Sequence, residues 1–375
     1  MRILFTGGGT GGHFYPIIAI ADELRLLAKE QHLIPPQLFF MSPTPYNRRI
    51  LFEHEITFVP AAAGKLRRYF SIRNFFDLFK TGWGILQSVA KIFIIFPDVV
   101  VGKGGYASFP PLLAARILRI PVIIHESDSE PGRVNRWAGK FAKWIAVSYP
   151  EAAEFFPKEE VAVTGQPLRR AIREKASRGA HEFLKFDPAL PVILILGGSL
   201  GAQMINEMIV QILPELVAKY QIIHQTGKNN FVEIEKTTAT ILRDNPNRAR
   251  YALYDYLDDT ALAMAAGAAT IVISRAGSTI FEIAAWGVPS IIIPINEKVS
   301  HDQTKNAFNY ARAGACVVIE ETNLAPHLLT AEIDRLIADT ARREEMSARA
   351  SAFSHPNAAA VIASEILSLA LVHEK

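Results

Sequence analysis

The segment Ile3-Leu-Phe-Thr-Gly-Gly-Gly-Thr-Gly-Gly-His13 decides the fold of the N-terminal half. A short apolar run breaks into a glycine-rich turn, and apolar residues at helical spacing resume at Ile17, Ile18, Ile20 and Leu24. Glycines at a strand-to-helix turn let the backbone come close to a ligand, and the helix that follows directs unpaired N–H groups toward it. The turn therefore predicts a site for an anion.

His13 adds a titratable side chain at the mouth of this turn. Imidazole titrates near neutral pH, so it can take up or release a proton during a reaction. We consider His13 the leading candidate for a general base. A histidine that only makes local hydrogen bonds is the alternative.

Gly7, Gly9 and Gly12 also match the G-x-G-x-x-G spacing of dinucleotide-binding proteins. That motif needs an acidic residue about 20 positions further on, where the second strand ends, to bind a ribose diol. The second strand is expected at Gln37-Leu-Phe-Phe-Met41, and Ser42-Pro-Thr44 follows it without a carboxylate. A nicotinamide-dependent oxidoreductase is therefore disfavoured. A P-loop is disfavoured too, because no Gly-Lys-Ser/Thr sequence follows the turn.

Length and composition indicate a large globular protein without nucleic-acid features. The 375 residues suggest two or three domains, and half of them are hydrophobic. The only cysteine, Cys316, reads as a buried strand residue and fits a reducing compartment. We expect a soluble or peripheral protein, because we find no signal peptide and no uncharged apolar stretch of about 18 residues. The net charge of +3 and the lack of a nucleic-acid motif give no reason to expect nucleic acid.

Short runs rich in valine and isoleucine alternate with helical patterns throughout the chain, which predicts parallel sheets covered on both faces and an α/β fold. The pattern also restarts, because Pro191-Val-Ile-Leu-Ile-Leu196 leads into a second glycine turn, Gly197-Gly-Ser199. We therefore expect two Rossmann-like domains, at 1–164 and 165–350, and a C-terminal helix within 351–375 that packs back on the first. Further strands are expected at 98–101, 121–124, 144–147, 192–196, 222–224, 270–274 and 290–293.

Ser278 and Glu282 form a second candidate site in the C-terminal half. They lie four residues apart at the start of a predicted helix that follows a strand, so the hydroxyl and the carboxylate share one helix face. This pair suits a ribosyl phosphate, with Ser278 toward the phosphate and Glu282 accepting from the ribose hydroxyls. The alternative is a serine that caps the helix beside a solvated glutamate.

Seven motifs that occur in order, up to about Gly314, together resemble the MurG family. That family comprises the peptidoglycan glycosyltransferases that transfer N-acetylglucosamine (GlcNAc) from UDP-GlcNAc to lipid I and so form lipid II. The motifs are Gly8-Gly-Thr-Gly-Gly-His13, Gly104-Gly-Tyr106, His125-Glu-Ser127, Gly165-Gln-Pro-Leu-Arg169, Gly197-Gly-Ser199, Ser274-Arg-Ala-Gly-Ser278 and Asp302-Gln-Thr-Lys-Asn-Ala307.

The resemblance implies a GT-B fold, in which two Rossmann-like domains face each other across a cleft and the C-terminal one holds most of the donor. His13 would lie near the acceptor hydroxyl. The resemblance also implies which residues bind the substrates: Thr10, Gly11 and Gly12 would bind the sugar and phosphates, Arg169 and Ser199 the diphosphate, and Leu257 uracil through its backbone. Glu282 would bind the ribose and Gln303 the sugar hydroxyls.

Three positions depart from the family pattern. Asp128 stands where many members have Asn, Gln166 stands where Asn is commoner before Pro, and Asp302 stands where some members have a second Gln. Asp128 therefore receives no role in sugar binding, and donor selection depends more on Gln303.

We expect a mechanism without a metal or another cofactor, because we find no Asp-x-Asp pair for a diphosphate-bound ion and no zinc-type cluster. The C4 hydroxyl of the acceptor would attack the anomeric carbon with inversion while His13 accepts its proton. Helix N-termini, together with Arg169 and Ser199, would stabilise the negative charge that develops on the departing UDP. Glu126 is the second candidate base, with orientation of its neighbours as its alternative role.

The segment 65–83 mixes basic and large apolar residues and predicts a helix that lies on an anionic membrane surface. Aromatic residues at helical spacing in a buried core are the equal alternative. With a lipid-linked acceptor, we expect a peripheral enzyme at the cytoplasmic face of the bacterial membrane. The residues concerned are Lys65, Arg67, Arg68, Arg73 and Lys80, with Tyr69, Phe70, Phe75, Phe76, Phe79 and Trp83.

Three alternative functions stay open at this point. Another lipid glycosyltransferase or a UDP-GlcNAc epimerase could share the scaffold, and analysis of the product separates them. A non-catalytic sugar-nucleotide sensor would need neither His13 nor a membrane-binding segment.

Overall fold

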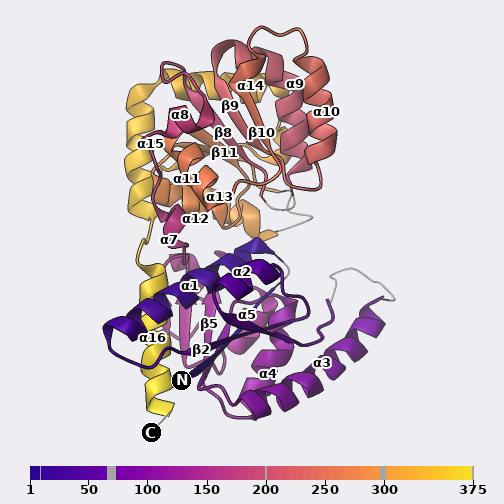
Figure 1. Cartoon of the computed structure of the whole chain (residues 1–375), viewed down its shortest axis with the longest axis vertical. Coiled ribbons are helices and arrows are strands. Elements are labelled where there is room, and N and C mark those ends of the chain that lie inside the picture. Colours follow the sequence, from indigo (N-terminus) through magenta and orange to yellow (C-terminus); the bar gives the residue numbers. More distant parts are fainter. Residues whose placement is uncertain (9, 66–72, 199–200, 296–300, 374–375) are drawn as a thin grey trace. The chain divides into compact units, whose positions relative to one another are not determined.

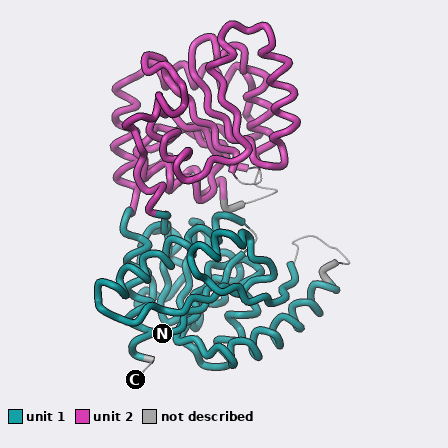
Figure 2. The backbone as a smooth tube through the Cα atoms, in the orientation of Figure 1, with its two compact units in different colours: residues 1–169, 356–375 teal, residues 170–355 magenta. Residues whose placement is uncertain are grey.

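The computed structural model describes residues 1–8, 10–65, 73–198, 201–295 and 301–373 (Figure 1). The chain divides into two compact units (Figure 2). Unit 1 comprises Met1–Arg169 and Pro356–Lys375, and unit 2 comprises Arg170–His355. Each unit is built on one parallel sheet, so the predicted pair of Rossmann-like α/β domains is confirmed.

The described strands of unit 1 form a seven-stranded sheet in the order β3-β2-β1-β4-β5-β6-β7. All of its strand pairs are parallel, and β1 lies near the centre between β2 and β4. The strands are β1 (Arg2–Thr6), β2 (Gln37–Ser42), β3 (Ile56–Pro60), β4 (Val99–Gly102), β5 (Val122–Glu126), β6 (Trp144–Val147) and β7 (Val161–Val163).

Helices connect these strands, as parallel pairing requires. They are α1 (Gly11–Glu30), α2 (Arg48–Glu53), α3 (Arg73–Ile95), the 3-10 turn η1 (Tyr106–Ser108), α4 (Phe109–Ile117), α5 (Arg133–Ala138) and α6 (Pro150–Ala153).

The last helix of the chain, α16 (Ala358–His373), belongs to unit 1 and packs beside α1 (Figure 1). Ile362 and Ile366 of α16 are completely buried in the cluster that also contains Ile17 and Ile18 of α1. The helix thus covers apolar surface that α1 would otherwise expose. The predicted boundary after residue 350 falls inside α15 (Thr340–Phe353), and the chain returns to unit 1 at Pro356.

Unit 2 repeats the plan with a six-stranded parallel sheet in the order β10-β9-β8-β11-β12-β13. Its central strands β8 and β11 are completely buried and, apart from Ser274 at the end of β11, apolar, which is typical of a sheet covered on both faces. The strands are β8 (Val192–Leu196), β9 (Gln221–Gln225), β10 (Tyr251–Tyr254), β11 (Ile271–Ser274), β12 (Ser290–Ile292) and β13 (Cys316–Val318).

Helices cover this second sheet as well. They are α7 (Arg170–Arg173), α8 (Ala180–Leu184), α9 (Gln203–Lys219), α10 (Phe231–Ile241), η2 (Arg248–Arg250), α11 (Asp259–Ala268), α12 (Thr279–Trp286), α13 (His301–Arg312), η3 (Glu321–Asn323), α14 (Pro326–Ala338) and α15.

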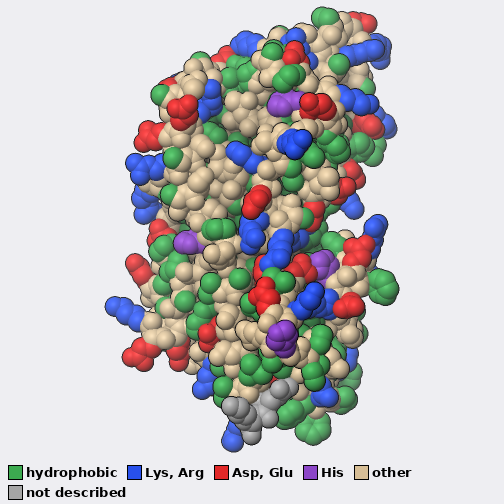
Figure 3. Space-filling view, turned by 60° about the vertical axis from the view of Figure 1, so that its left-hand side comes forward, with side chains coloured by type: hydrophobic (Ala, Val, Ile, Leu, Met, Phe, Trp, Pro, Cys, Tyr) green, Lys and Arg blue, Asp and Glu red, His purple; other side chains and the backbone are tan. Residues whose placement is uncertain are grey.

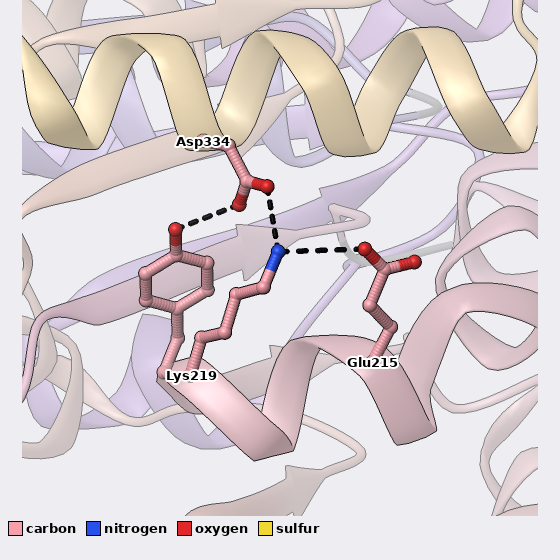
Figure 4. Close-up of polar contacts among 4 residues, drawn as sticks. Glu215, Lys219 and Asp334 are labelled. Carbon is pink, nitrogen blue, oxygen red and sulfur yellow. Dashed lines mark hydrogen bonds and ion pairs between the residues drawn. The ribbon is translucent and has the colours of Figure 1, made fainter.

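A small polar cluster ties α9 to α14 on the surface of unit 2 (Figure 4). Lys219 Nζ lies 2.7 Å from Asp334 Oδ2 and 3.5 Å from Glu215 Oε1. Tyr220 donates its hydroxyl to Asp334 Oδ1 at 2.7 Å. The charged pairs are partly exposed, so we expect them to add little to stability beside the apolar contacts beneath them.

The predicted strands at 144–147 and 192–196 occur with those bounds, and the other predicted strands agree to within two residues at either end. Three strands were not predicted: β3, β7 and β10. Each forms an edge of its sheet and is only partly buried. Such strands lack the continuous apolar run that reveals a central parallel strand.

Replacement of Ile366 by Ala should lower the free energy of unfolding of unit 1 by about 2–5 kcal/mol, because it leaves a cavity between α16 and α1. Val361 on the same helix is 47% exposed, so Val361→Ala should cost less than about 0.5 kcal/mol. Denaturant unfolding measures both changes. Equal, small effects would mean that α16 does not contribute to the core.

Candidate active site

The glycine turn of unit 1 lies where β1 and β4 end. The register that pairs Thr6 with Gly102 brings Gly7 beside Lys103, and a Cβ at Gly7 would lie 3.0 Å from Lys103 Cβ. A Cβ at Gly8 would lie 2.8 Å from Ser42 Oγ. The predicted close approach of the backbone is therefore an approach to the ends of the neighbouring strands.

Thr10 is the N-cap residue of α1, but its side chain does not cap the helix. Its hydroxyl instead shares a hydrogen bond of 3.0 Å with His13 Nδ1. The N–H groups of Gly11 and Gly12 open the helix, where no partner exists within the helix itself. They point positive partial charge away from the helix start, as an anion site requires.

His13 lies in the first turn of α1 with its ring edge near Gly105. A Cβ at Gly105 would lie 3.9 Å from His13 Nε2, in ordinary van der Waals contact with the ring. Burial, and secondarily the positive charge of Lys103, lowers the pKa of His13 to about 4. The imidazole is therefore neutral at pH 7 and has a lone pair with which to accept a proton.

Glu126 ends β5 and is buried, with hydrogen bonds to both carboxylate oxygens. The donors are the backbone N–H groups of Ser127 at 2.7 Å, Asp128 at 3.0 Å and Gly132 at 3.1 Å, together with Asn135 Nδ2 at 2.9 Å. A carboxylate with four donors holds the loop after β5 in place. The geometry thus favours the orienting role of Glu126 over the role of a second base.

Lys103 is a candidate functional residue that the sequence analysis missed. It follows β4, is only 2% exposed, and donates through Nζ to Ser127 Oγ. Ser127 and Ser148 both donate to Gln166 Oε1, at 2.8 Å and 3.0 Å. A charged residue directly after an apolar parallel strand was the available signal, because ligands bind at the carboxyl ends of such strands.

Arg169 lies beside the first turns of α1. Its guanidinium carbon is 4.1 Å from the centre of the Tyr15 ring, the geometry of a cation–π contact. Arg169 is thus held in unit 1, near the glycine turn.

The second glycine turn lies between β8 and α9, and its Ser199 falls outside the described residues. Gly198 has a φ of +73°, a conformation that favours glycine. A Cβ at Gly197 would lie 2.9 Å from the backbone oxygen of Gln225, so this turn is packed against the end of β9.

Ser278 immediately precedes α12, and its side chain makes no capping hydrogen bond. The capping alternative is therefore not realised. Glu282 lies in the first turn of the same helix and is half-buried. Arg275 is occupied elsewhere, because Nη2 contacts Glu321 Oε1 at 2.6 Å and Nη1 donates to Ile293 O at 3.3 Å.

Gln303 reaches the same loop from α13. Its Oε1 accepts from the backbone N–H of Ile295 at 3.2 Å, and its Nε2 lies 3.9 Å from where a Cβ of Gly277 would be. The amide hydrogens of Gln303 thus lie beside the turn that carries Ser278. Leu257 differs from the expectation, because its N–H already donates to Gln225 Oε1 at 3.0 Å. Only its carbonyl group is left to bind a base.

Two Rossmann-like units, each with a glycine turn that opens a helix at the carboxyl edge of its sheet, are typical of the GT-B fold. Residues 3–147 match the glycosyltransferase family 28 N-terminal domain and residues 192–362 match the corresponding C-terminal domain. The chain belongs to glycosyltransferase family 28 and, within it, to the MurG family.

Relatives and solved structures extend this similarity over nearly the whole chain. A Treponema denticola protein named UDP-N-acetylglucosamine--N-acetylmuramyl-(pentapeptide) pyrophosphoryl-undecaprenol N-acetylglucosamine transferase is 34% identical over 97% of this chain and 94% of its own. A Clostridium novyi protein of the same name is 35% identical, with coverages of 90% and 91%.

Among solved structures, Acinetobacter baumannii MurG has a TM-score of 0.73 and 26% identity, over 98% of this chain and 99% of its own. The UDP complex of Staphylococcus aureus MnaA has a TM-score of 0.69 at 18% identity, with coverages of 98% and 97%, and so shares the fold.

Glu282→Ala should weaken UDP binding about tenfold to a hundredfold, because a hydrogen bond to a charged group is worth about 1.5–3 kcal/mol. Glu235 lies exposed on α10 of the same unit, so Glu235→Ala is the matched control and should leave affinity unchanged. Calorimetry with UDP measures both. Equal affinities in the two variants would remove Glu282 from the site.

Proposed function

We propose that this chain transfers N-acetylglucosamine from UDP-N-acetylglucosamine to undecaprenyl-diphosphate-linked N-acetylmuramyl pentapeptide, converting lipid I to lipid II in peptidoglycan synthesis. The observation that carries the proposal is the agreement, over 97% of the chain, with a relative named for this reaction. The site geometry supports it, since each unit offers a glycine turn and a helix N-terminus suited to phosphate groups.

In the proposed mechanism the C4 hydroxyl of the acceptor attacks the anomeric carbon of N-acetylglucosamine. The bond from that carbon to the UDP oxygen breaks with inversion, and His13 takes the proton of the attacking hydroxyl. Thr10 holds the His13 ring through Nδ1, so Nε2 is the nitrogen we assign as the acceptor. Glu126 keeps the loop beside this turn in place.

We assign donor binding mainly to unit 2. Glu282 would accept from the ribose hydroxyls, Ser278 would bind phosphate, and the amide hydrogens of Gln303 would bind the sugar hydroxyls. Thr10, Gly11 and Gly12 would contact the sugar and phosphates, while Arg169 and Ser199 would meet the negative charge of the departing UDP. The Leu257 carbonyl group would face uracil.

The acceptor is carried by a lipid, and α3 is the surface that we assign to the membrane. Its aromatic side chains are exposed, with Phe76, Phe79 and Trp83 at 66%, 64% and 60%. Lys80 is exposed among them. Arg67, Arg68, Tyr69 and Phe70 of the predicted segment lie outside the described residues, as does the side chain of Arg73. An exposed row of large apolar side chains is typical of a binding surface.

By length and composition alone, two stretches of the described chain could cross a bilayer, Phe75–Ile95 and Thr340–Val372. The first carries Asp77, Lys80 and Lys91. The second joins α15 and α16 across a break at 354–357 and is partly buried. We therefore propose a peripheral protein at the cytoplasmic face of the bacterial membrane.

We propose no nucleic-acid partner, because basic and acidic side chains are interspersed on the face shown in Figure 3.

The deciding experiment incubates the protein with UDP-N-acetylglucosamine and a soluble lipid I analogue and identifies the product by mass spectrometry. The expected product is the acceptor extended by one N-acetylhexosamine, with release of UDP. An epimerised donor without extension of the acceptor would instead indicate an epimerase.

His13→Ala should lower the rate of the chemical step by about 10²–10⁴-fold and leave the affinity for UDP-N-acetylglucosamine nearly unchanged, as expected on loss of a general base. Single-turnover kinetics at saturating substrates measures the rate. His327→Ala, at an exposed position on α14, is the control. A full rate in His13→Ala would assign His13 a structural role.

The double change Phe76→Ser and Phe79→Ser should weaken binding to anionic vesicles and leave the melting temperature nearly unchanged, because both rings are exposed. High salt should weaken the binding of the unaltered protein, since each nearby Lys or Arg contributes about 1 kcal/mol of screened attraction. Phe52 and Phe183 are exposed elsewhere and serve as controls when changed to Ser. A steep loss of thermal stability with vesicle binding intact would place the aromatic rings in a core.

A further inference from the structure

Lys103 is a buried cation without a direct ionic partner in the described part of the chain. Its ammonium group has one hydrogen-bond acceptor there, Ser127 Oγ. Ser127 in turn donates its hydroxyl to Gln166, so the acceptor of the Lys103 ammonium group belongs to a hydrogen-bond network of uncharged side chains. An ammonium group is costly to bury unless charge or hydrogen bonds compensate it.

Two carboxylates lie near enough to act on Lys103 through their charge. Burial lowers the pKa of Lys103 to about 8, and the charges of Glu126 and Asp128 oppose this effect. Lys103 is therefore protonated at pH 7. Glu126 directs its oxygens to three backbone N–H groups of its own loop and to Asn135 Nδ2 of α5, so it is no hydrogen-bonded partner of the ammonium group.

Of the other groups around the turn, the two histidines are neutral, and the guanidinium group of Arg169 lies beside the first turns of α1. His125 donates Nε2–H to Gly165 O at 3.1 Å, and burial together with the charge of Lys103 keeps its pKa well below the ordinary value. His13 is neutral for the same reasons. The helix N-terminus at Gly11 adds positive partial charge. Lys103 thus brings to this turn a positive charge that Glu126 and Asp128 offset only at a distance, without a direct ion pair among the described residues.

We infer that Lys103 is the counter-charge for a phosphate group of a substrate bound at the unit 1 turn, and that it couples the binding of this anion to proton acceptance by His13. The second half of this inference rests on the proposed function, which makes His13 the base. The ligand is defined by its chemistry as a diphosphate, which either the nucleotide donor or the lipid-linked acceptor can supply.

The coupling follows from the sign of the charges. Burial, and in addition the positive charge of Lys103, disfavours the imidazolium form of His13, so without an anion His13 is a weak base. A diphosphate at the turn offsets the charge of Lys103 and so raises the pKa of His13 above about 4, while the larger effect of burial remains. His13 then becomes a stronger base when substrate is present.

The test measures the pKa of His13 in the full-length protein by NMR, with the signal assigned from His13→Gln. Titrations are run without ligand and with inorganic pyrophosphate, UDP or a soluble diphosphate acceptor analogue. We expect pyrophosphate to raise the pKa of His13. If the pKa of His13 rises with UDP but not with the acceptor analogue, the nucleotide donor supplies the diphosphate that binds at the turn. If it rises with the acceptor analogue but not with UDP, the acceptor supplies it. An unchanged pKa with all three ligands overturns the inference.

Variants test the part played by Lys103 itself. Lys103→Met should raise the pKa of His13 in the absence of ligand and weaken binding of the effective diphosphate about tenfold or more, whereas Lys103→Arg should retain most of that affinity. Lys29→Met, at the exposed end of α1, is the control. Equal affinities in Lys103→Met and Lys29→Met overturn the inference. The titration is carried out on the unaltered protein, with His13→Gln used only to assign the signal, and it does not depend on turnover, so its failure is distinct from failure of the proposed reaction.

Discussion

Parallel pairing is the constraint on which the rest of the structure depends. Because every strand of a sheet runs in one direction, all strands of that sheet end at the same edge. The chain must then cross back through a helix, and the helix begins at that edge with its unpaired N–H groups.

This arrangement concentrates polar side chains where backbone hydrogen bonding ends, and most of them are used to hold loops. Glu126 and Asn135 fix the loop after β5, and Gln225 fixes the backbone after β10. Arg275 and Glu321 hold the loop after β12 in the same way. A buried polar group that finds partners stabilises the loop around it, whereas one without partners costs free energy.

The candidate site could be predicted where its chemistry is local in the sequence. The glycine turn with Thr10 and His13, and the pair of Ser278 and Glu282, each lie within a few residues of one helix start, so spacing alone brings them together. Lys103 could not be found in this way. Its position beside Gly7 depends on the register between β1 and β4, whose residues lie far apart in the chain.

The sequence by itself determined the two parallel sheets, their central strands and the glycine turns, because continuous apolar runs and glycines act through local geometry. Only the tertiary structure decided which polar atoms are still able to bind a ligand. Gln225 occupies the N–H of Leu257 across 32 residues of chain, and Asn135 Nδ2 reaches Glu126 from the following helix. A hydrogen bond between distant residues depends on how the strands pair and the helices pack, and no spacing in the sequence encodes it.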